Sequence, residues 1–275
     1  MKKPRSSHRF LLIIIILLSS CLQQSTNIQD EPTQQHSTVA LYSDKGTWED
    51  SVEALQNMFQ WMGYSVTLVD AQYINNEDLD DFSILCIPGG DMYQYAQKIS
   101  SKGKKTIRNF IDNGGGYIGV CGGAYFASKK VVWRGNQLSM ITLELFPGTA
   151  EGPFNEIVLY PDYAMCEIDM VTTHPVTQSG APVEWMLYYW GPMLISDDID
   201  ADIAILGRYT AGNQPAIVAF DYGKGRVFLI GTHPEIEEDS SRDGVEFADE
   251  LDDNGSDWDL MKRAVLWCLK ELNQK

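Results

Sequence analysis

Segments typical of buried strands alternate with segments typical of amphipathic helices through the first half of this chain. Residues 82–88 and 117–120 are continuous apolar runs that end in glycine-rich turns, a pattern expected of strands buried on both faces. Apolar residues at helical spacing fill 47–62, between shorter strand-like segments at 38–42 and 64–69. Such alternation predicts an α/β domain with a doubly wound, mostly parallel sheet and helices on both faces.

The remaining elements extend this pattern. We expect further helices at 93–99, 104–111 and 124–129, and a closing amphipathic helix at 258–272. The middle of the chain is richer in short strands, which we expect at 157–160, 184–189 and 203–208. A hairpin of 216–220 and 226–230 surrounds the turn at 222–225. The sequence shows no internal repeat and no second domain.

A cysteine follows directly on the buried strand at 117–120. Residues 119–123 read Gly-Val-Cys-Gly-Gly, the form of a sharp strand-to-helix elbow that exposes a nucleophile at Cys121. The positive end of the following helix favours a thiolate. The elbow therefore indicates nucleophilic catalysis, although a buried structural thiol is the alternative.

A histidine and a carboxylate lie close together about 110 residues later. The second hairpin strand ends at residues 231–235, Gly-Thr-His-Pro-Glu. His233 can accept and return a proton, and Glu235 can hold the imidazole in one tautomer. The backbone N–H of Gly122 and a second donor from the turn at Gly90 can form an oxyanion hole.

Together these motifs resemble class I glutamine amidotransferase-like domains, and they are most similar to the biotin–protein ligase N-terminal-like branch. The resemblance rests on motifs in the family order at 87–91, 107–108, 119–125, 189–192, 214–218, 222–227 and 233–235. It implies a flavodoxin-like core and a catalytic triad of Cys121, His233 and Glu235. It leaves the reaction open, because the family includes amidotransferases, peptidases and members of unknown activity.

The N-terminal segment has the features of an export signal. A basic start precedes the apolar run 10–18, and Leu-Ser-Ser-Cys follows at 18–21. Residues 18–21 resemble a bacterial lipobox, which implies cleavage before Cys21 and a lipid on its thiol. An ordinary signal peptide is the alternative. We expect a signal peptide at 1–20, a polar tether at 21–37 and one domain at 38–275. The protein would then be exported and lipid-anchored to the cell membrane or outer membrane, facing outside the cytoplasm.

Charge excludes one class of partner. The chain has 21 Lys and Arg against 38 Asp and Glu, a formal net charge of −17, so we expect no nucleic acid partner. Residues 250–255 imitate the start of an EF-hand loop, but Met261 stands where that loop requires Glu. We therefore expect no metal and no cofactor.

Several residues have a structural explanation. Cys86 and Cys268 lie in apolar segments and are expected in the core, and the role of Cys166 stays open. His174 has no carboxylate two residues later and is interpreted as structural. Four aromatic residues could line a pocket, although packing is the commoner role for such residues: Tyr93, Tyr125, Tyr189 and Trp190.

The favoured function is therefore a membrane-anchored, cysteine-dependent hydrolase of an amide bond in a small-molecule or peptide substrate. The alternatives are a non-catalytic module of the cell envelope that binds a small ligand or peptide, and an interaction protein for which the acidic charge is the only indication. The intact set of Cys121, His233 and Glu235 distinguishes the first hypothesis from the others.

Overall fold

The computed structural model describes residues 38–198, 201–238, 240–251 and 255–272. The expected signal peptide at 1–20 and the tether at 21–37, with Cys21, lie outside the described residues. Within the described ranges, no helix has the length and apolar character needed to cross a membrane.

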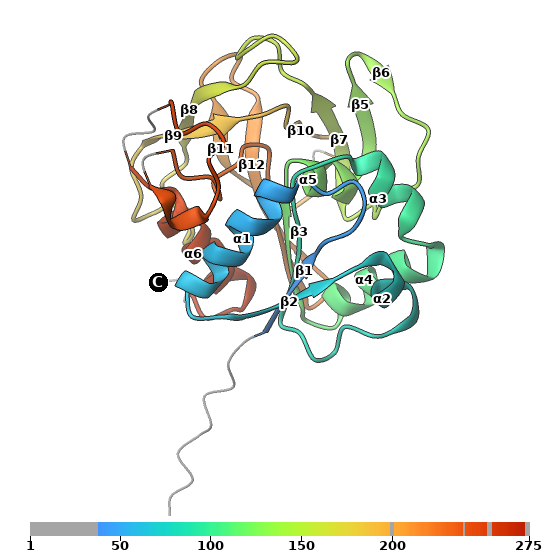
Figure 1. The fold of residues 1–275 in the computed structure, drawn as a ribbon. Helices are drawn as coiled ribbons and strands as arrows, with labels where there is room; N and C mark the ends of the chain where they lie inside the picture. The colour runs from blue at the N-terminus through green and yellow to red at the C-terminus, as the bar shows by residue number, and fades with distance from the viewer. Residues whose placement is uncertain (1–37, 199–200, 239, 252–254, 273–275) are drawn as a thin grey trace, which may run out of the picture. The chain divides into compact units, whose positions relative to one another are not determined.

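A nine-stranded mixed sheet forms the centre of the domain, in the order β2-β1-β3-β4-β13-β12-β11-β8-β9 (Figure 1). The parallel half contains β2 (Ser65–Val69), β1 (Thr38–Tyr42), β3 (Ile84–Ile87), β4 (Gly116–Val120) and β13 (Gly225–Ile230). The antiparallel half contains β12 (Pro215–Tyr222), β11 (Ile203–Tyr209), β8 (Ala164–Met170) and β9 (Val183–Tyr188). Continuous apolar sequences in β3 and β4 are buried along their whole length, as the sequence predicts.

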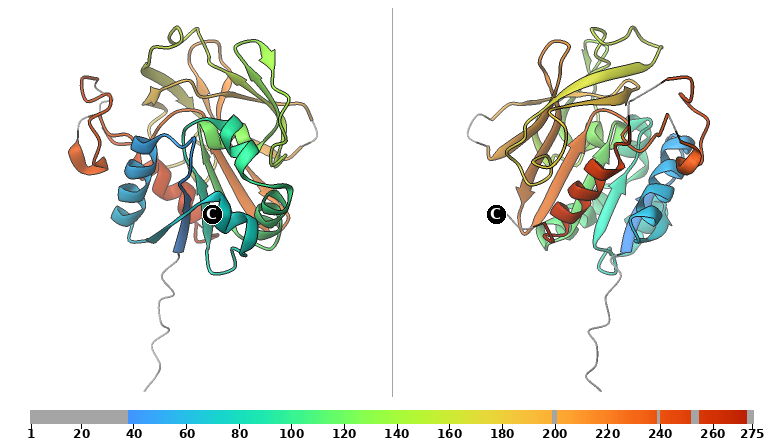
Figure 2. Two further views of the ribbon diagram at one scale, coloured as in Figure 1. Left: turned by 45° about the vertical axis from the view of Figure 1, so that its right-hand side comes forward. Right: turned by 90° about the vertical axis from the view of Figure 1, so that its left-hand side faces the viewer.

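Helices cover both faces of the parallel half (Figure 2). On one face lie α1 (Glu49–Trp61) and α6 (Trp258–Cys268), and α1 buries Val52, Leu55 and Phe59 at helical spacing. The opposite face packs against α2 (Ala71–Asn76), α3 (Met92–Lys98), α4 (Ser101–Asp112) and α5 (Gly122–Ala127). Sheet and helices confirm the predicted flavodoxin-like α/β class.

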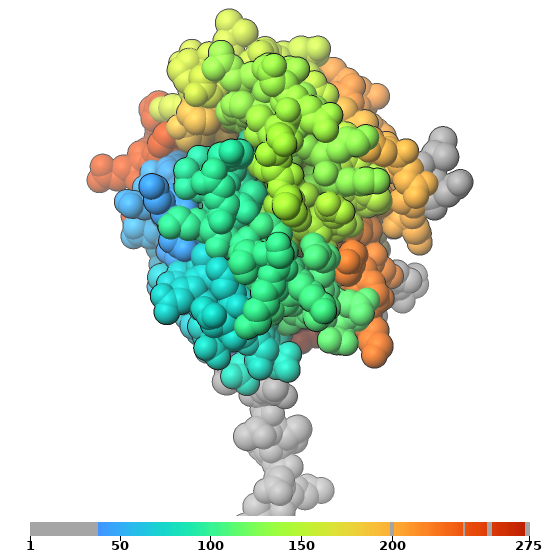
Figure 3. Space-filling model, turned by 90° about the vertical axis from the view of Figure 1, so that its right-hand side faces the viewer, coloured from blue at the N-terminus to red at the C-terminus, as the bar shows by residue number. Residues whose placement is uncertain are grey.

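A second, four-stranded sheet was not predicted. Its order is β10 (Met193–Ser196), β7 (Phe146–Gly152), β5 (Ser128–Trp133) and β6 (Asn136–Gln137). Strand β5 begins where α5 ends, so the helix expected at 124–129 stops at Ala127. The space-filling view shows the segment that contains β5 to β7, in yellow-green, above the cyan-to-green helices (Figure 3).

The prediction of a strand at 157–160 is wrong. This segment is a loop between β7 and β8, and none of the described strands pairs with it. Ile157 and Val158 pack at the edge of the core, whereas Leu159 is 68% exposed. The local apolar run therefore reflects loop packing and not a sheet position.

Three neighbouring parallel strands end together at one edge of the main sheet. Ile87 of β3 pairs with Gly119 of β4, and Val120 pairs with Ile230 of β13. The three segments that leave these strands therefore start side by side. They carry the Pro-Gly-Gly turn, the cysteine elbow and the histidine segment, and in such sheets ligands bind at this edge.

Candidate active site

Cys121 stands at a strained elbow between β4 and α5. Its backbone has φ 45° and ψ −100°, a conformation that L-residues rarely adopt and that costs about 1–3 kcal/mol. Hydrogen bonds hold it on both sides: its N–H donates to Ile230 O at 2.9 Å, and its carbonyl accepts from Ala124 and Tyr125 at 3.0 Å. Neighbouring elements thus fix the position of the thiol.

The two glycines predicted to supply oxyanion donors lie against each other. A Cβ atom on Gly122 would lie 2.4 Å from Gly90 O and 2.8 Å from Gly90 N, so only glycine permits this contact. Gly90 itself has φ 141°. The start of α5 and the Pro-Gly-Gly turn therefore meet directly beside Cys121.

His233 and Glu235 form a buried pair. Nδ1 of His233 lies 2.9 Å from Glu235 Oε1, and the two side chains are 1% and 0% exposed. Backbone bonds fix both residues, because the His233 N–H donates to Leu187 O at 2.9 Å and Trp258 Nε1 donates to Glu235 O at 3.0 Å. The pairing leaves Nε2 of His233 buried and without a hydrogen-bond partner among the described residues.

Opposing effects act on the protonation of His233. Burial by itself lowers its pKa, but the Glu235 carboxylate and then the Cys121 thiol stabilise the imidazolium and together raise the pKa to about 10. The pairing with Glu235 thus favours the protonated ring, which can donate a proton from Nε2.

Ser51 belongs to this cluster and was missed in the sequence analysis. Its buried hydroxyl donates to Glu235 Oε1 at 2.5 Å and accepts from the Gly89 N–H at 3.0 Å. It therefore connects the carboxylate to the Pro-Gly-Gly turn. A polar residue on the otherwise apolar face of α1, one turn before Leu55, is the signal that could have revealed it.

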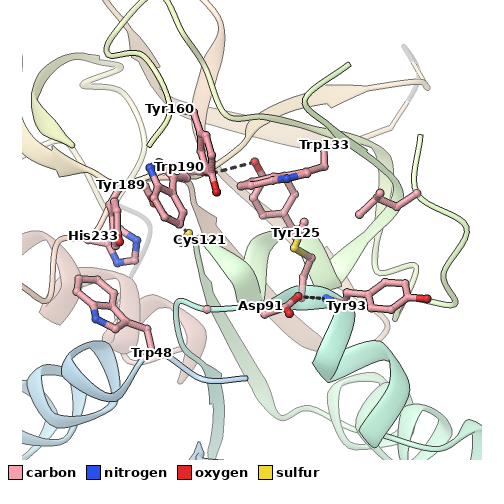
Figure 4. Close-up of a pocket in the computed structure, with 13 residues that line it drawn as sticks. Trp48, Asp91, Tyr93, Cys121, Tyr125, Trp133, Tyr160, Tyr189, Trp190 and His233 are labelled. Carbon is pink, nitrogen blue, oxygen red and sulfur yellow. Dashed lines mark hydrogen bonds between the residues drawn. The ribbon is translucent and has the colours of Figure 1, made fainter. Parts of the chain in front are cut away.

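A cavity of about 570 Å³ opens over Cys121 and His233 (Figure 4). Near it the Cys121 thiol donates to Tyr189 O at 3.6 Å. Aromatic side chains dominate the lining: Trp48, Tyr93, Tyr125, Trp133, Tyr160, Tyr189 and Trp190. The sequence analysis named four of these aromatics as possible pocket residues, with packing as the commoner role, and the structure places all four in the cavity wall. The others come from elements whose proximity the sequence does not reveal.

Contacts between distant segments hold one wall of the cavity in place. Tyr125 Oη donates to Trp190 O at 3.0 Å, and Trp190 Nε1 donates to Pro161 O at 3.1 Å. Gly191 packs so tightly on Gly231 that a Cβ atom would overlap the Gly231 carbonyl. The aromatic wall is thus fixed against both Cys121 and the His233 segment.

The remaining candidates lie outside the cavity lining. His174 Nδ1 accepts from the Val176 N–H at 3.2 Å and its ring packs on Trp267; burial, with a smaller effect of Arg226, lowers its pKa. Cys86, Cys166 and Cys268 are buried and free. No group of three or more potential metal ligands occurs within the described part of the chain.

Two curated proteins show sequence similarity to this chain. It is 27% identical to a biotin–protein ligase of Schizosaccharomyces pombe over 191 residues, which are 65% of this chain and 30% of the ligase. It is 25% identical to an uncharacterized protein of Chlamydia muridarum over 213 residues, 72% of this chain and 80% of that protein. The chain thus spans less than a third of the ligase that it matches.

Solved structures share the fold at low sequence identity. PurLQS from Thermotoga maritima superposes with a TM-score of 0.56 at 14% identity, over 84% of this chain and 98% of that chain. A glutamine amidotransferase from the same organism gives 0.53 at 12% identity, over 86% and 99%. These likenesses show a class I glutamine amidotransferase-like fold.

A family model described as "Biotin-protein ligase, N terminal" matches residues 37–270. The match covers most of the chain and includes the cysteine elbow, the Pro-Gly-Gly turn and the histidine segment. The chain therefore belongs to the biotin–protein ligase N-terminal family.

Proposed function

We propose that this protein is a cysteine-dependent hydrolase that cleaves an amide C–N bond, with Cys121 as nucleophile, His233 as acid and base, and Glu235 as the group that orients the imidazole. One observation carries the proposal. His233 is paired with Glu235 and lines the same cavity as Cys121, which is held at a strained elbow, and its Nε2 has no hydrogen-bond partner among the described residues. Because most buried polar atoms of native proteins have a hydrogen-bond partner, we interpret Nε2 as the atom available to a substrate.

The first half of the reaction forms a thioester. The Cys121 thiolate attacks the amide carbon, and electrons of the C=O bond move to oxygen. When the tetrahedral intermediate collapses, the C–N bond breaks and His233 Nε2 donates its proton to the leaving amine. The backbone N–H groups of Gly90 and Gly122 are the candidate donors to the oxyanion.

The second half restores the enzyme. His233, now neutral, accepts a proton from water, and the resulting hydroxide attacks the thioester carbon. Collapse breaks the C–S bond, releases the carboxylic acid and regenerates the thiolate beside the imidazolium. Glu235 keeps Nδ1 protonated throughout, so Nε2 alone exchanges protons.

The fold supports this chemistry without specifying the substrate. A solved neighbour is described as a glutamine amidotransferase, which makes amide chemistry at a cysteine a reasonable function for this fold. The similarity to biotin–protein ligase covers 30% of that protein, so its ligase activity is not part of the proposal.

We also propose that the protein is anchored to a membrane by a lipid on Cys21 and faces outside the cytoplasm. The support is the sequence at 1–21: a basic start, a short apolar run and Leu-Ser-Ser-Cys. The polar tether expected at 21–37 would separate the lipid from the catalytic domain.

Thiol reactivity and thioester trapping test the catalytic proposal. The purified full-length protein is treated with limiting iodoacetamide at pH 7 and the modified cysteines are identified by mass spectrometry. We expect Cys121 to react first, because burial raises the pKa of Cys86, Cys166 and Cys268. A library of amides and peptides is then screened for an acyl adduct on Cys121 and for product release.

Two results would contradict the catalytic proposal. One is equal labelling of Cys121 and the three core cysteines. The other is product release by Cys121→Ala at the rate of the wild type. A ligand that binds in the cavity without any acyl adduct on Cys121 would favour the non-catalytic binding module.

A further inference from the structure

The charge of the cavity lining is acidic. Among the described residues that line it, Asp91 is the only carboxylate, His233 belongs to the proposed catalytic group, and no Lys or Arg side chain is present. The formal net charge of the whole chain is −17, so the protein field also attracts cations and repels anions. A substrate with a carboxylate near its scissile amide, as in free glutamine, would find no basic side chain in this lining.

Asp91 is held where a ligand can reach it. Its Oδ1 accepts from the Tyr93 N–H at 2.9 Å, which caps α3, and its own N–H donates to Gly46 O at 2.7 Å. Asp91 is an exposed residue of the lining, and Figure 4 shows it beside Tyr93 and below Tyr125, Trp133 and Tyr160. A carboxylate has two oxygens, so capping by Oδ1 leaves acceptor capacity for a bound cation.

Aromatic rings face this carboxylate across the cavity. Trp133 packs edge-on against both Tyr125 and Tyr160, with ring centroids 5.8 Å and 6.1 Å apart. The ring centroids of Tyr160 and Trp190 lie 4.7 Å apart. Such rings bind planar or apolar groups by stacking, and their faces attract cations. Arg134 already lies over the Tyr160 ring at 4.8 Å but is not part of the lining.

We propose that the cavity binds a cationic aromatic amide: a molecule whose free ammonium group pairs with Asp91 and whose planar side chain packs on Trp133 and Tyr160, while its amide carbon reaches Cys121. Amino-acid amides with an aromatic side chain, and short peptides that begin with such a residue, have this chemistry. The proposal rests on the hydrolase function for its scissile bond. A cavity of about 570 Å³ is large enough for such a ligand.

Binding to a catalytically inactive variant tests the proposal separately from turnover. Cys121→Ala is titrated with L-phenylalaninamide, N-acetyl-L-phenylalaninamide and L-glutamine, with the fluorescence of the cavity tryptophans and calorimetry as readouts. We expect phenylalaninamide to bind about 5-fold more tightly than its uncharged acetyl derivative, which corresponds to about 1 kcal/mol, the upper range for an ion pair with an exposed carboxylate. Glutamine should bind more weakly than either.

Asp91→Asn is the matched variant, since Asn also caps helices and keeps the acceptor for the Tyr93 N–H. In the Cys121→Ala background it should remove the preference for the ammonium group and leave binding of the acetyl derivative within about 2-fold. Trp133→Leu should weaken both aromatic ligands. Asp221→Asn, the same substitution at an exposed carboxylate of β12 outside the lining, should leave the preference unchanged.

The outcomes separate this inference from the hydrolase function. A preference for phenylalaninamide that disappears in Asp91→Asn supports the inference, even if the wild type hydrolyses none of the ligands. Absence of saturable binding, equal affinity for the three ligands, or a preference that persists in Asp91→Asn overturns it. Hydrolysis of glutamine by the wild type without any cationic preference would retain the hydrolase function and overturn the inference.

Discussion

The hydroxyl of Ser51 donates a 2.5 Å hydrogen bond to Glu235 Oε1, the same oxygen that pairs with the His233 ring. This contact joins helix α1 to a segment 184 residues later in the chain. Ser51 also accepts a hydrogen bond from the Gly89 N–H, so it links the Glu235 carboxylate to the Pro-Gly-Gly turn that carries the candidate oxyanion donor. We interpret Ser51 as a positioning residue.

Replacing Ser51 with Ala should lower kcat by about 10-fold and leave KM within about 2-fold, because the hydroxyl positions the catalytic pair and does not border the cavity. The loss of a buried hydrogen bond to a carboxylate should also reduce the free energy of unfolding by about 1–3 kcal/mol. Steady-state kinetics on the best amide substrate and denaturant unfolding measure the two effects.

Ser128→Ala is the matched control, since this buried hydroxyl bonds Ala124 O at 2.9 Å. It should reduce stability without a specific loss of kcat. Equal kinetics for Ser51→Ala and Ser128→Ala would contradict the positioning role.

Variants of the catalytic group should show graded losses. Cys121→Ala should lower kcat by about 10⁵-fold or more, because no thioester can form. His233→Ala should lose nearly as much, and Glu235→Gln should lose less because Glu235 does not contact substrate. His174→Ala should retain near-normal turnover. The measurements are kcat and the rate of Cys121 alkylation, and a fully active His233→Ala would show that another base operates.

Gly89→Ala should disturb His233 by steric contact alone. A Cβ atom at this position would lie 2.5 Å from His233 Cε1 and 3.3 Å from Ser51 Oγ. We expect a loss of activity and about 1–3 kcal/mol of stability, as for other overpacked sites. Gly63→Ala is a useful comparison, because no atom lies within 4 Å of the added Cβ and only its φ of 89° makes it unfavourable. If both variants kept full activity, the close approach of Gly89 to the imidazole would be unimportant.

Stability should fall as the pH rises above about 6.5. Folded His233 retains its proton up to a pKa of about 10, whereas the unfolded chain releases it near the usual value of 6.5. This contribution is complete below pH 6.5 and is lost as the pH approaches 10. Thermal unfolding between pH 6 and 9 should therefore show a decline for the wild type that is weaker in His233→Gln. Parallel curves for the two proteins would show that His233 is neutral in the folded state.

Cys21→Ser should abolish lipid attachment and release the protein from the membrane fraction. The substitution removes the thiol to which the expected lipid is attached. Metabolic labelling with a fatty-acid probe and fractionation in the native host measure the effect. Cys166→Ser, a change at a buried core cysteine, is the control for loss of a thiol. Unchanged labelling and membrane retention of Cys21→Ser would refute the lipid anchor.

Local sequence patterns were sufficient for the main elements and for the proposed triad. Unbroken apolar runs specify the buried strands β3 and β4, because only such residues can be enclosed on both faces of a sheet. The glycines around Cys121 specify a backbone elbow, since close backbone approach excludes side chains there. His233 and Glu235 are near in sequence, so their pairing follows from local geometry.

Only the tertiary structure decided which distant residues surround this triad. Ser51 enters through the packing of α1, Trp133 through a second sheet that was not predicted, and Tyr160 through a loop that was predicted as a strand. The wrong prediction of a strand at 157–160 has the same cause, because strand formation depends on a pairing partner elsewhere in the chain. The sequence by itself thus determined the proposed reactive groups, whereas long-range packing determined the cavity, its aromatic walls and its acidic lining.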